Sequence, residues 1–215
     1  MKLYGLMLSP FVARVRLAMR VKNIDCALEP PPGGAPRSSE FLAINPIGRV
    51  PVLLTDDGLS IAESETIIDH LDEAFPSPPL IPVDQAVRAR MRNAIRVFEL
   101  YVTPAMSRLF GQLGPASRNQ MIVEAEIERW RDGLALTSNF IDDGDFAVGG
   151  GISKADCMLL PSLLLCRVAG TFFGIDDIVD NYPILAGYRD KARRHPDMGP
   201  IWEETETALA ASTSG

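Results

Sequence analysis

Short strand patterns alternate with helical patterns over the first part of the chain. Lys2–Leu6 and Ile24–Glu29 are predicted strands, and between them apolar residues recur at helical spacing after Ser9 and Pro10. Serine followed by proline favours a helix start, because the serine oxygen accepts a free backbone N–H and proline needs no N–H at that position. The two strands should run parallel, since a helical crossover joins them.

A predicted β-hairpin follows and runs straight into another helix. Its strands, Val52–Thr55 and Leu59–Ala62, flank an Asp-Asp-Gly turn, and an Asp-Gly pair between aliphatic runs is a strong hairpin signal. Pro51 precedes the first strand, where its missing N–H costs least. Ser64 is expected to cap the next helix, and a short helix over Ser39–Ile44 is expected before the hairpin. The element order is therefore β-α-β-α-β-β-α.

Strand patterns stop after the proline-rich segment 76–82. Apolar residues between Met91 and Leu109 step by three or four positions and predict a long helix, which Pro104 should kink or split. Further helices are expected at Val123–Leu134, Ala155–Val168, Tyr182–Arg194 and Ile201–Leu209. The second of these four is nearly all apolar and too short for a membrane, so we predict a buried core helix. The final residues, 210–215, are expected to be frayed.

These two regions predict a chain of mixed class, α/β followed by all-α. An α/β domain is expected over residues 1–76, a linker over 77–84 and an all-helical domain over 85–215. The linker is rich in proline, which disfavours regular structure. A chain of 215 residues is long enough for two small domains, each with its own core.

Composition and charge narrow the range of functions. The formal net charge of −7 is spread evenly along the chain, so no basic face is predicted and nucleic acid is not an expected partner. The start of the sequence lacks the apolar stretch of a signal peptide, and no segment reaches membrane length. Three scattered cysteines, Cys26, Cys157 and Cys166, indicate a reducing compartment without a disulfide framework. We therefore expect a cytoplasmic protein with no membrane partner.

No metal or organic cofactor is predicted. The two histidines, His70 and His195, have no cysteine cluster beside them, so a zinc site is not expected. The glycine run at 149–151 lacks both the Lys-Ser/Thr of a phosphate loop and the spacing of a dinucleotide fingerprint.

Four motifs, taken in order and at their spacing, resemble those of the cytosolic glutathione transferases. They are Ser9–Arg16 (SPFVARVR), Asn45–Leu53 (NPIGRVPVL), Glu63-Ser64 and Ser153–Asp156 (SKAD). The resemblance covers nearly the entire chain. It implies a thioredoxin-like fold for the βαβαββα domain, an all-helical C-terminal domain, glutathione as co-substrate, a homodimer and a role in detoxification. The last motif is similar to a capping box, so Ser153 and Asp156 are assigned to folding rather than to substrate binding.

Ser9 is the candidate catalytic residue. The thiol of glutathione has an unperturbed pKa of about 8.5, and lowering it by roughly two units takes about 2.7 kcal/mol of preferential thiolate stabilisation. A hydroxyl at the positive end of a helix is a reasonable source. The resemblance implies that Ser9 is the thiolate-stabilising serine of the serine-type classes; a plain helix cap is the alternative, and one serine can serve both uses. Tyr4 is a competing hydroxyl, which we predict to pack in the core.

Glu63 and Ser64 are candidates for binding the γ-glutamyl end of glutathione. A serine hydroxyl and free N–H groups at a helix start suit a carboxylate, and the Glu63 carboxylate suits an ammonium. The alternative is a helix cap preceded by a solvated acid. The resemblance further implies a cis bond before Pro51, which exposes the backbone of Val50 to the cysteinyl unit.

Two further sets of side chains are candidates by position. Arg49, and with less support Arg37, would pair with the glycyl carboxylate; a solvent-facing arginine is the alternative for each. Phe11, Met106 and Phe110 are candidates for a second site that binds an apolar electrophile, with core packing as the alternative for each.

The leading hypothesis is a transferase that conjugates the glutathione thiolate to an apolar electrophile. A glutathione-dependent cis–trans isomerase of the maleylacetoacetate type is an alternative, suggested by the Ser-x-x-x-x-Arg-Val-Arg spacing, although that class has a denser serine cluster. A non-catalytic glutathione-binding protein on the same fold is the third hypothesis. The joint presence of Ser9, Pro51, Glu63 and Ser64 argues against it.

Overall fold

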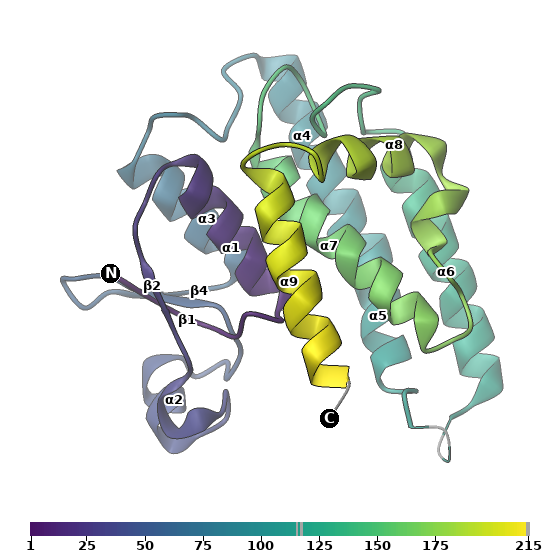
Figure 1. Cartoon of the computed structure of the whole chain (residues 1–215), viewed down its shortest axis with the longest axis horizontal. Helices are drawn as coiled ribbons and strands as arrows, with labels where there is room; N and C mark the ends of the chain where they lie inside the picture. Colours follow the sequence, from purple (N-terminus) through teal and green to yellow (C-terminus); the bar gives the residue numbers. More distant parts are fainter. Residues whose placement is uncertain (115, 117, 214–215) are drawn as a thin grey trace. The chain divides into compact units, whose positions relative to one another are not determined.

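Two compact units make up the chain (Figure 1). The sheet unit comprises Met1–Ile81 together with the segment that begins at Arg193, and the helical unit comprises Pro82–Ala192. The computed structural model describes residues 1–114, 116 and 118–213. The predicted fold class is confirmed, because an α/β arrangement comes first and helices follow it.

A four-stranded mixed sheet forms the centre of the sheet unit, with strand order β2-β1-β3-β4. The strands are β1 (Lys2–Tyr4), β2 (Ala27–Glu29), β3 (Val52–Leu54) and β4 (Ser60–Ala62). β1 and β2 run parallel, whereas β1 with β3 and β3 with β4 run antiparallel. The predicted parallel crossover and the hairpin are therefore confirmed, although each strand is shorter than its sequence pattern.

The helices of the sheet unit follow the predicted order. They are α1 (Pro10–Val21), α2 (Ser39–Ile44) and α3 (Ser64–Ala74), with a short 3-10 turn, η1 (Pro32–Gly34), before α2. Phe41 of α2 packs with Tyr4 and Val52 in a buried cluster, and the Tyr4 and Phe41 rings meet edge to face with centroids 6.2 Å apart. Tyr4 is only 7% exposed, so its ring belongs to the core.

The start of α3 differs from the prediction. Ser64 was expected to be the capping residue, but it is the first residue of the helix and Glu63 occupies the N-cap position. Only Glu63 separates β4 from α3, so this single residue must reverse the chain direction. It does so with a φ of +66°, a region that non-glycine residues rarely adopt. The turn geometry, rather than the capping preference of serine, decides the helix start.

The segment after α3 is anchored by a buried ion pair that the sequence did not reveal. The Lys22 ammonium lies 2.7 Å from the Asp72 carboxylate, and the Lys22 side chain has no exposed surface. The same ammonium donates to the carbonyls of Phe75 and Pro78, at 2.6 and 2.8 Å. Asp72 in turn accepts the N–H of Leu80 at 2.8 Å. The ends of α1 and α3 and the proline-rich segment are thus joined by one cluster.

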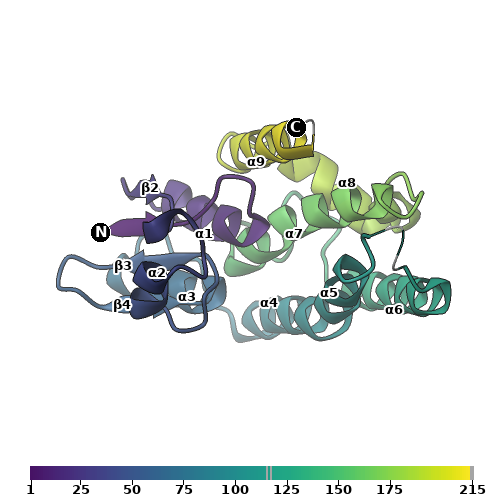
Figure 2. The ribbon, with the colours of Figure 1, turned by 90° about the horizontal axis from the view of Figure 1, so that it is seen from below.

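The C-terminal helix, α9 (Met198–Thr213), belongs to the sheet unit, whereas the sequence placed it in the all-helical domain. It packs beside α1, where Arg16 pairs with Glu204, 188 positions away (Figures 1 and 2). A contact over such a separation leaves no periodic signal in the sequence.

The predicted boundaries at 76 and 85 stay a prediction. The prediction that the chain is frayed from residue 210 is wrong for residues 210–213, which belong to α9. Residues 214 and 215 lie outside the described chain.

The helical unit consists of successive helices among its described residues. They are α4 (Gln85–Val97), η2 (Phe98–Val102), α5 (Thr103–Phe110), α6 (Gln120–Ser138), α7 (Lys154–Thr171), η4 (Ile178–Asn181) and α8 (Pro183–Ala192). The predicted split at Pro104 is confirmed, since the turn before it, η2, winds as a π-helix. Proline lacks the N–H that would continue the α-helical ladder, so the helix widens there.

The predicted core helix and its capping box are both present. Leu159 and Leu160 are representative of α7, being at most 1% exposed. The Ser153 oxygen accepts the Ala155 N–H at 3.2 Å, and Asp156 accepts the Ser153 N–H at 2.8 Å. Asp156 also accepts the Ala147 N–H at 2.8 Å, so it holds the preceding loop as well. Over the described residues, no helix is long and apolar enough to cross a membrane.

Candidate functional site

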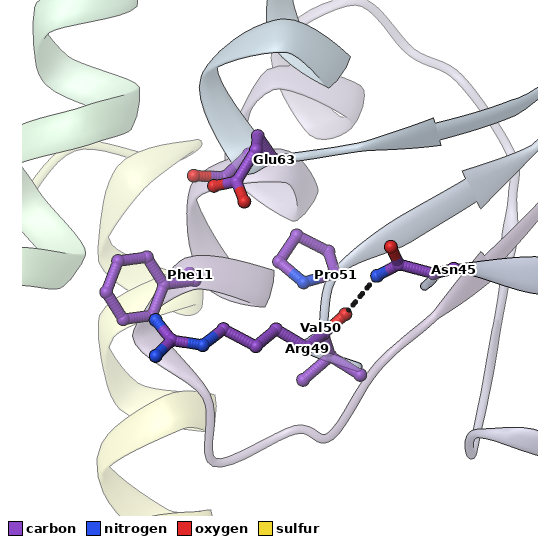
Figure 3. Close-up of a pocket in the computed structure, with 7 residues that line it drawn as sticks. Phe11, Asn45, Arg49, Val50, Pro51 and Glu63 are labelled. Atoms are coloured by element: carbon purple, nitrogen blue, oxygen red, sulfur yellow. Dashed lines mark hydrogen bonds between the residues drawn. The ribbon is translucent and has the colours of Figure 1, made fainter. Parts of the chain in front are cut away.

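A pocket in the sheet unit gathers most of the predicted binding residues (Figure 3). Its lining residues are Phe11, Asn45, Arg49, Val50, Pro51, Glu63 and Ser64. It encloses about 370 Å³, part of which is open to solvent. Six of the seven were singled out from the sequence, and they come from the start of α1, the loop before β3 and the start of α3. The chain therefore brings together residues more than fifty positions apart.

The loop between α2 and β3 forms one wall of the pocket. Val50 is half-buried and Pro51 is buried, and the peptide bond between them is cis, in accordance with the expectation from the resemblance. Pro51 directly precedes β3, so the loop reaches the sheet at this point. The main chain of Val50 therefore lies at the edge of the pocket, just before strand pairing begins.

Asn45 is the lining residue that the sequence did not single out as functional. It is 2% exposed, and its side chain bonds to two main-chain groups of the same loop. The Nδ2 atom donates to the Arg49 carbonyl at 2.8 Å (Figure 3). The Oδ1 atom accepts the Ile47 N–H at 3.1 Å. An asparagine before a proline at a helix end is a local signal for a turn, but nothing in it points to a binding site.

The opposite wall carries an acid and an uncapped helix start. Glu63 is exposed and makes no side-chain cap for α3, while Ser64 is 5% exposed. The first N–H groups of a helix without a side-chain cap are available to a ligand, and the helix dipole adds partial positive charge there. The Glu63 conformation costs about 1–3 kcal/mol, as sparsely populated backbone regions do. An acceptor for an ammonium thus lies beside donors for a carboxylate.

Ser9 caps α1 and lies outside the set of residues that line this pocket. Its oxygen accepts the Val12 N–H at 3.4 Å, and the residue is half-buried. A hydroxyl has one proton to donate and two lone pairs to accept with. Capping uses a lone pair, so the O–H remains a donor. The cap geometry is compatible with the catalytic role, which stays a prediction.

An aromatic–cation stack lies next to the start of α1. The Arg14 guanidinium is 4.6 Å from the centroid of the Phe11 ring, and Arg14 is 3% exposed. Such a contact holds the ring in place and keeps a permanent positive charge near it. Phe11 was predicted for the electrophile site, and it lines the same pocket as the predicted glutathione residues.

The remaining predicted residues lie elsewhere. Arg37 is exposed and is not among the lining residues. Met106 and Phe110 belong to α5 of the helical unit; Met106 is 3% exposed with its sulfur 3.5 Å from that of Cys166, and Phe110 is 36% exposed. Their assignment to an electrophile site stays a prediction. Within the described part of the chain, no group of His, Cys, Asp or Glu side chains is arranged to hold a metal ion.

Comparison with known proteins supports the fold of the chain. The family model for the N-terminal domain of glutathione S-transferase matches residues 3–79, which contain the whole pocket. A maleylacetoacetate isomerase of Pseudomonas aeruginosa is 32% identical over 91% of this chain and 92% of its own length. A probable glutathione S-transferase of Zea mays is 29% identical over 97% of this chain and 93% of its own.

A solved structure agrees with these sequence matches. The tau class glutathione S-transferase of mango, Mangifera indica, superimposes with a TM-score of 0.81 and 25% identity, covering 99% of this chain and 97% of that one. The matches extend along nearly the entire chain, so both units are similar to those of the matched proteins. On this sequence identity and coverage, the chain belongs to the glutathione S-transferase family of enzymes.

Proposed function

We propose that the protein is a glutathione transferase that binds glutathione in the pocket of the sheet unit and transfers its thiolate to an apolar electrophile. The observation that carries this proposal is the joint placement of the Val50 main chain, the Glu63 carboxylate and the uncapped start of α3 around one pocket. Glutathione has a peptide backbone, an ammonium and a carboxylate at matching places. It is a co-substrate, and no other cofactor is part of the proposal.

The three parts of glutathione would each meet a different element. The γ-glutamyl carboxylate would bind at the start of α3 and Ser64, with its ammonium on Glu63. The cysteinyl backbone would pair with Val50, and the glycyl carboxylate with Arg49, which is exposed on the pocket wall. Arg37, outside that wall, is a second candidate for the glycyl end.

Ser9 would stabilise the thiolate. Its hydroxyl proton remains a donor while its oxygen caps α1, and an O–H bond to a thiolate at a helix start lowers the thiol pKa. The electrophile would then meet apolar side chains, for which Phe11, Met106 and Phe110 are candidates.

An isomerase is the second candidate function. The P. aeruginosa relative at 32% identity is named a maleylacetoacetate isomerase, and this specific match favours the alternative. In such a reaction the thiolate would add to a cis double bond and leave again after rotation, so glutathione would be regenerated rather than consumed. The same binding site and the same serine would serve both reactions.

One pair of assays separates these functions. Retention on immobilised glutathione tests binding, and conjugation of glutathione to a chloronitroarene tests transfer. A cis-to-trans shift of a maleyl-type substrate without consumption of glutathione would support the isomerase. We expect retention and conjugation; retention with neither activity would instead favour a binding protein, and no retention would contradict the glutathione site altogether.

We also propose that the protein acts as a cytoplasmic homodimer with a role in detoxification. The helical unit carries a second hollow between η2, α5 and α6, with Leu100, Tyr101 and Leu136 about half exposed along it. Gly133 forms its floor, since a Cβ there would lie 2.9 Å from the Tyr101 carbonyl.

Charge favours a second copy of the chain as the occupant of this hollow. Arg129 and Asp132 lie three positions apart on α6 along its rim, so the face carries both signs of charge beside apolar side chains. Such a face can pair with itself across a two-fold axis, each arginine meeting the other copy's aspartate.

A further inference from the structure

We propose that Asn45 is a positioning residue for glutathione. Its side-chain amide would set the plane of the Arg49–Val50 peptide, and thereby aim the Val50 N–H at the cysteinyl unit. This inference rests on the proposed glutathione site and adds a residue with a defined task to it. Asn45 is almost fully buried, yet it lines the pocket, and its polar atoms are directed at main-chain groups of the loop.

Asn45 organises the complete turn between α2 and β3. Its main-chain carbonyl accepts the Gly48 N–H at 3.0 Å, which closes a turn, and Gly48 has a φ of +65°. Within that turn the side-chain Oδ1 accepts from Ile47, and Nδ2 reaches past the turn to the Arg49 carbonyl. An amide can donate to one group and accept from another at the same time, which a carboxylate cannot do. The residue type therefore fits the two contacts.

The hydrogen bond from Asn45 to the Arg49 carbonyl also fixes the orientation of the Val50 N–H. A peptide unit is planar, and in its trans form the carbonyl and the following N–H point in opposite directions. The bond from Asn45 to the Arg49 carbonyl thus directs the Val50 N–H away from Asn45. Because Pro51 has no N–H, this is the last main-chain donor before β3. A ligand that pairs with the main chain here depends on the orientation of this donor.

The two contacts of the Asn45 side chain can be separated by substitution. Asn45→Asp keeps an acceptor for the Ile47 N–H but places a carboxylate against the Arg49 carbonyl, where no proton remains to donate. When that carboxyl is protonated, its O–H can donate to the carbonyl again. Protonation of the variant therefore restores the one contact that we assign to glutathione positioning, while the turn contact persists throughout.

The experiment measures the dissociation constant of glutathione by calorimetry, at about pH 8 and about pH 5.5, for the wild type and Asn45→Asp. We expect the variant to bind about 10-fold more weakly than the wild type at the higher pH, as loss of a buried hydrogen bond predicts. The ratio to wild type should approach one at the lower pH, because residue 45 is buried and burial raises the pKa of the introduced carboxyl above that of a free aspartate. Asn45→Ser, whose hydroxyl is too short to bridge both groups, should be weak at both pH values. At saturating glutathione, kcat of each variant should stay within about 2-fold of wild type, because Ser9 is unchanged.

Ser60→Ala is the matched control. The Ser60 hydroxyl donates to the Ile44 carbonyl at 2.9 Å, next to Asn45, and this bond involves neither Ile47 nor Arg49, the two partners of the Asn45 side chain. Removing it should leave glutathione affinity unchanged. The positioning role is overturned if Asn45→Asp binds as tightly as wild type at both pH values, or if its weakness is independent of pH and shared by Ser60→Ala. If the wild type itself does not bind glutathione, the proposed function fails first and this inference falls with it.

Discussion

At the residue scale, the Ser9 hydroxyl caps a helix and is also the group that we propose to stabilise the thiolate. Its oxygen caps α1 through Val12, and its proton remains a donor. We expect Ser9→Ala to lower turnover by about 10- to 100-fold at neutral pH, because the bound thiol would lose roughly one to two units of pKa depression. Glutathione affinity should change little. The deficit should shrink as pH rises toward the pKa of the free thiol, which a pH–rate profile measures.

Ser38→Ala is the control for the lost helix cap. Ser38 caps α2 by accepting the Phe41 N–H at 3.1 Å, so its removal costs comparable capping energy, about 1 kcal/mol, at a place without a proposed catalytic role. Its turnover should equal that of wild type. Unchanged turnover in Ser9→Ala would contradict the assignment and direct attention to Tyr4, whose ring is buried against Phe41.

Glu63 allows strain and charge to be tested separately. Glu63→Gly removes both the acid and the penalty of a positive φ, so we expect stability to rise by about 1 kcal/mol while glutathione binding weakens by about 10-fold or more. Glu63→Gln keeps the conformation and loses only the charge, so binding should weaken with no gain in stability. Thermal unfolding and calorimetry measure the two quantities. A Glu63→Gly variant that binds normally would show that the acid does not meet the ammonium.

At the element scale, the Lys22–Asp72 pair joins α1, α3 and the proline-rich segment. Lys22→Met leaves the Asp72 carboxylate without its cation at a site where the Lys22 side chain is fully buried and that of Asp72 is 11% exposed. We expect a loss of about 3–5 kcal/mol in the free energy of unfolding, as for other broken buried pairs. Urea denaturation measures this loss.

An exposed pair in the same unit provides the comparison. Lys2 lies 3.0 Å from Glu29 with both side chains well exposed, so Lys2→Met should cost far less stability than Lys22→Met. Equal losses in Lys22→Met and Lys2→Met would mean that the buried cluster does not hold the segment.

At the scale of the whole molecule, the proposed dimer surface on the helical unit is open to a direct test. Leu136 is 44% exposed in the hollow beside Gly133, so Leu136→Arg should leave the folded chain intact but place a charge in the interface. We expect a shift from dimer to monomer in light scattering after size-exclusion chromatography. Met121→Arg is the control, because Met121 is 77% exposed on α6 outside the hollow. A dimer that survives Leu136→Arg would place the interface elsewhere.

Much of the fold was readable from local patterns. Ser9 and Pro10 predicted the start of α1, the Asp-Asp-Gly turn predicted the hairpin, and Pro104 predicted the break before α5. Each of these features depends on residues within a few positions of one another, where propensity and capping act directly. The resemblance added the binding residues, and six of the seven residues lining the pocket were among them.

The features of the fold and the site that were not predicted from the sequence depend on contacts that only the folded chain makes. The positive φ of Glu63 follows from the tight passage between β4 and α3, and the hydrogen bond from Asn45 to Arg49 follows from the closure of a turn. Lys22 forms an ion pair with Asp72, fifty positions later, and Arg16 forms one with Glu204 on α9. The sequence by itself determined the elements and the chemistry of the binding residues. The tertiary structure decided which main-chain groups face the pocket, because closing segments across long separations leaves no trace in local periodicity.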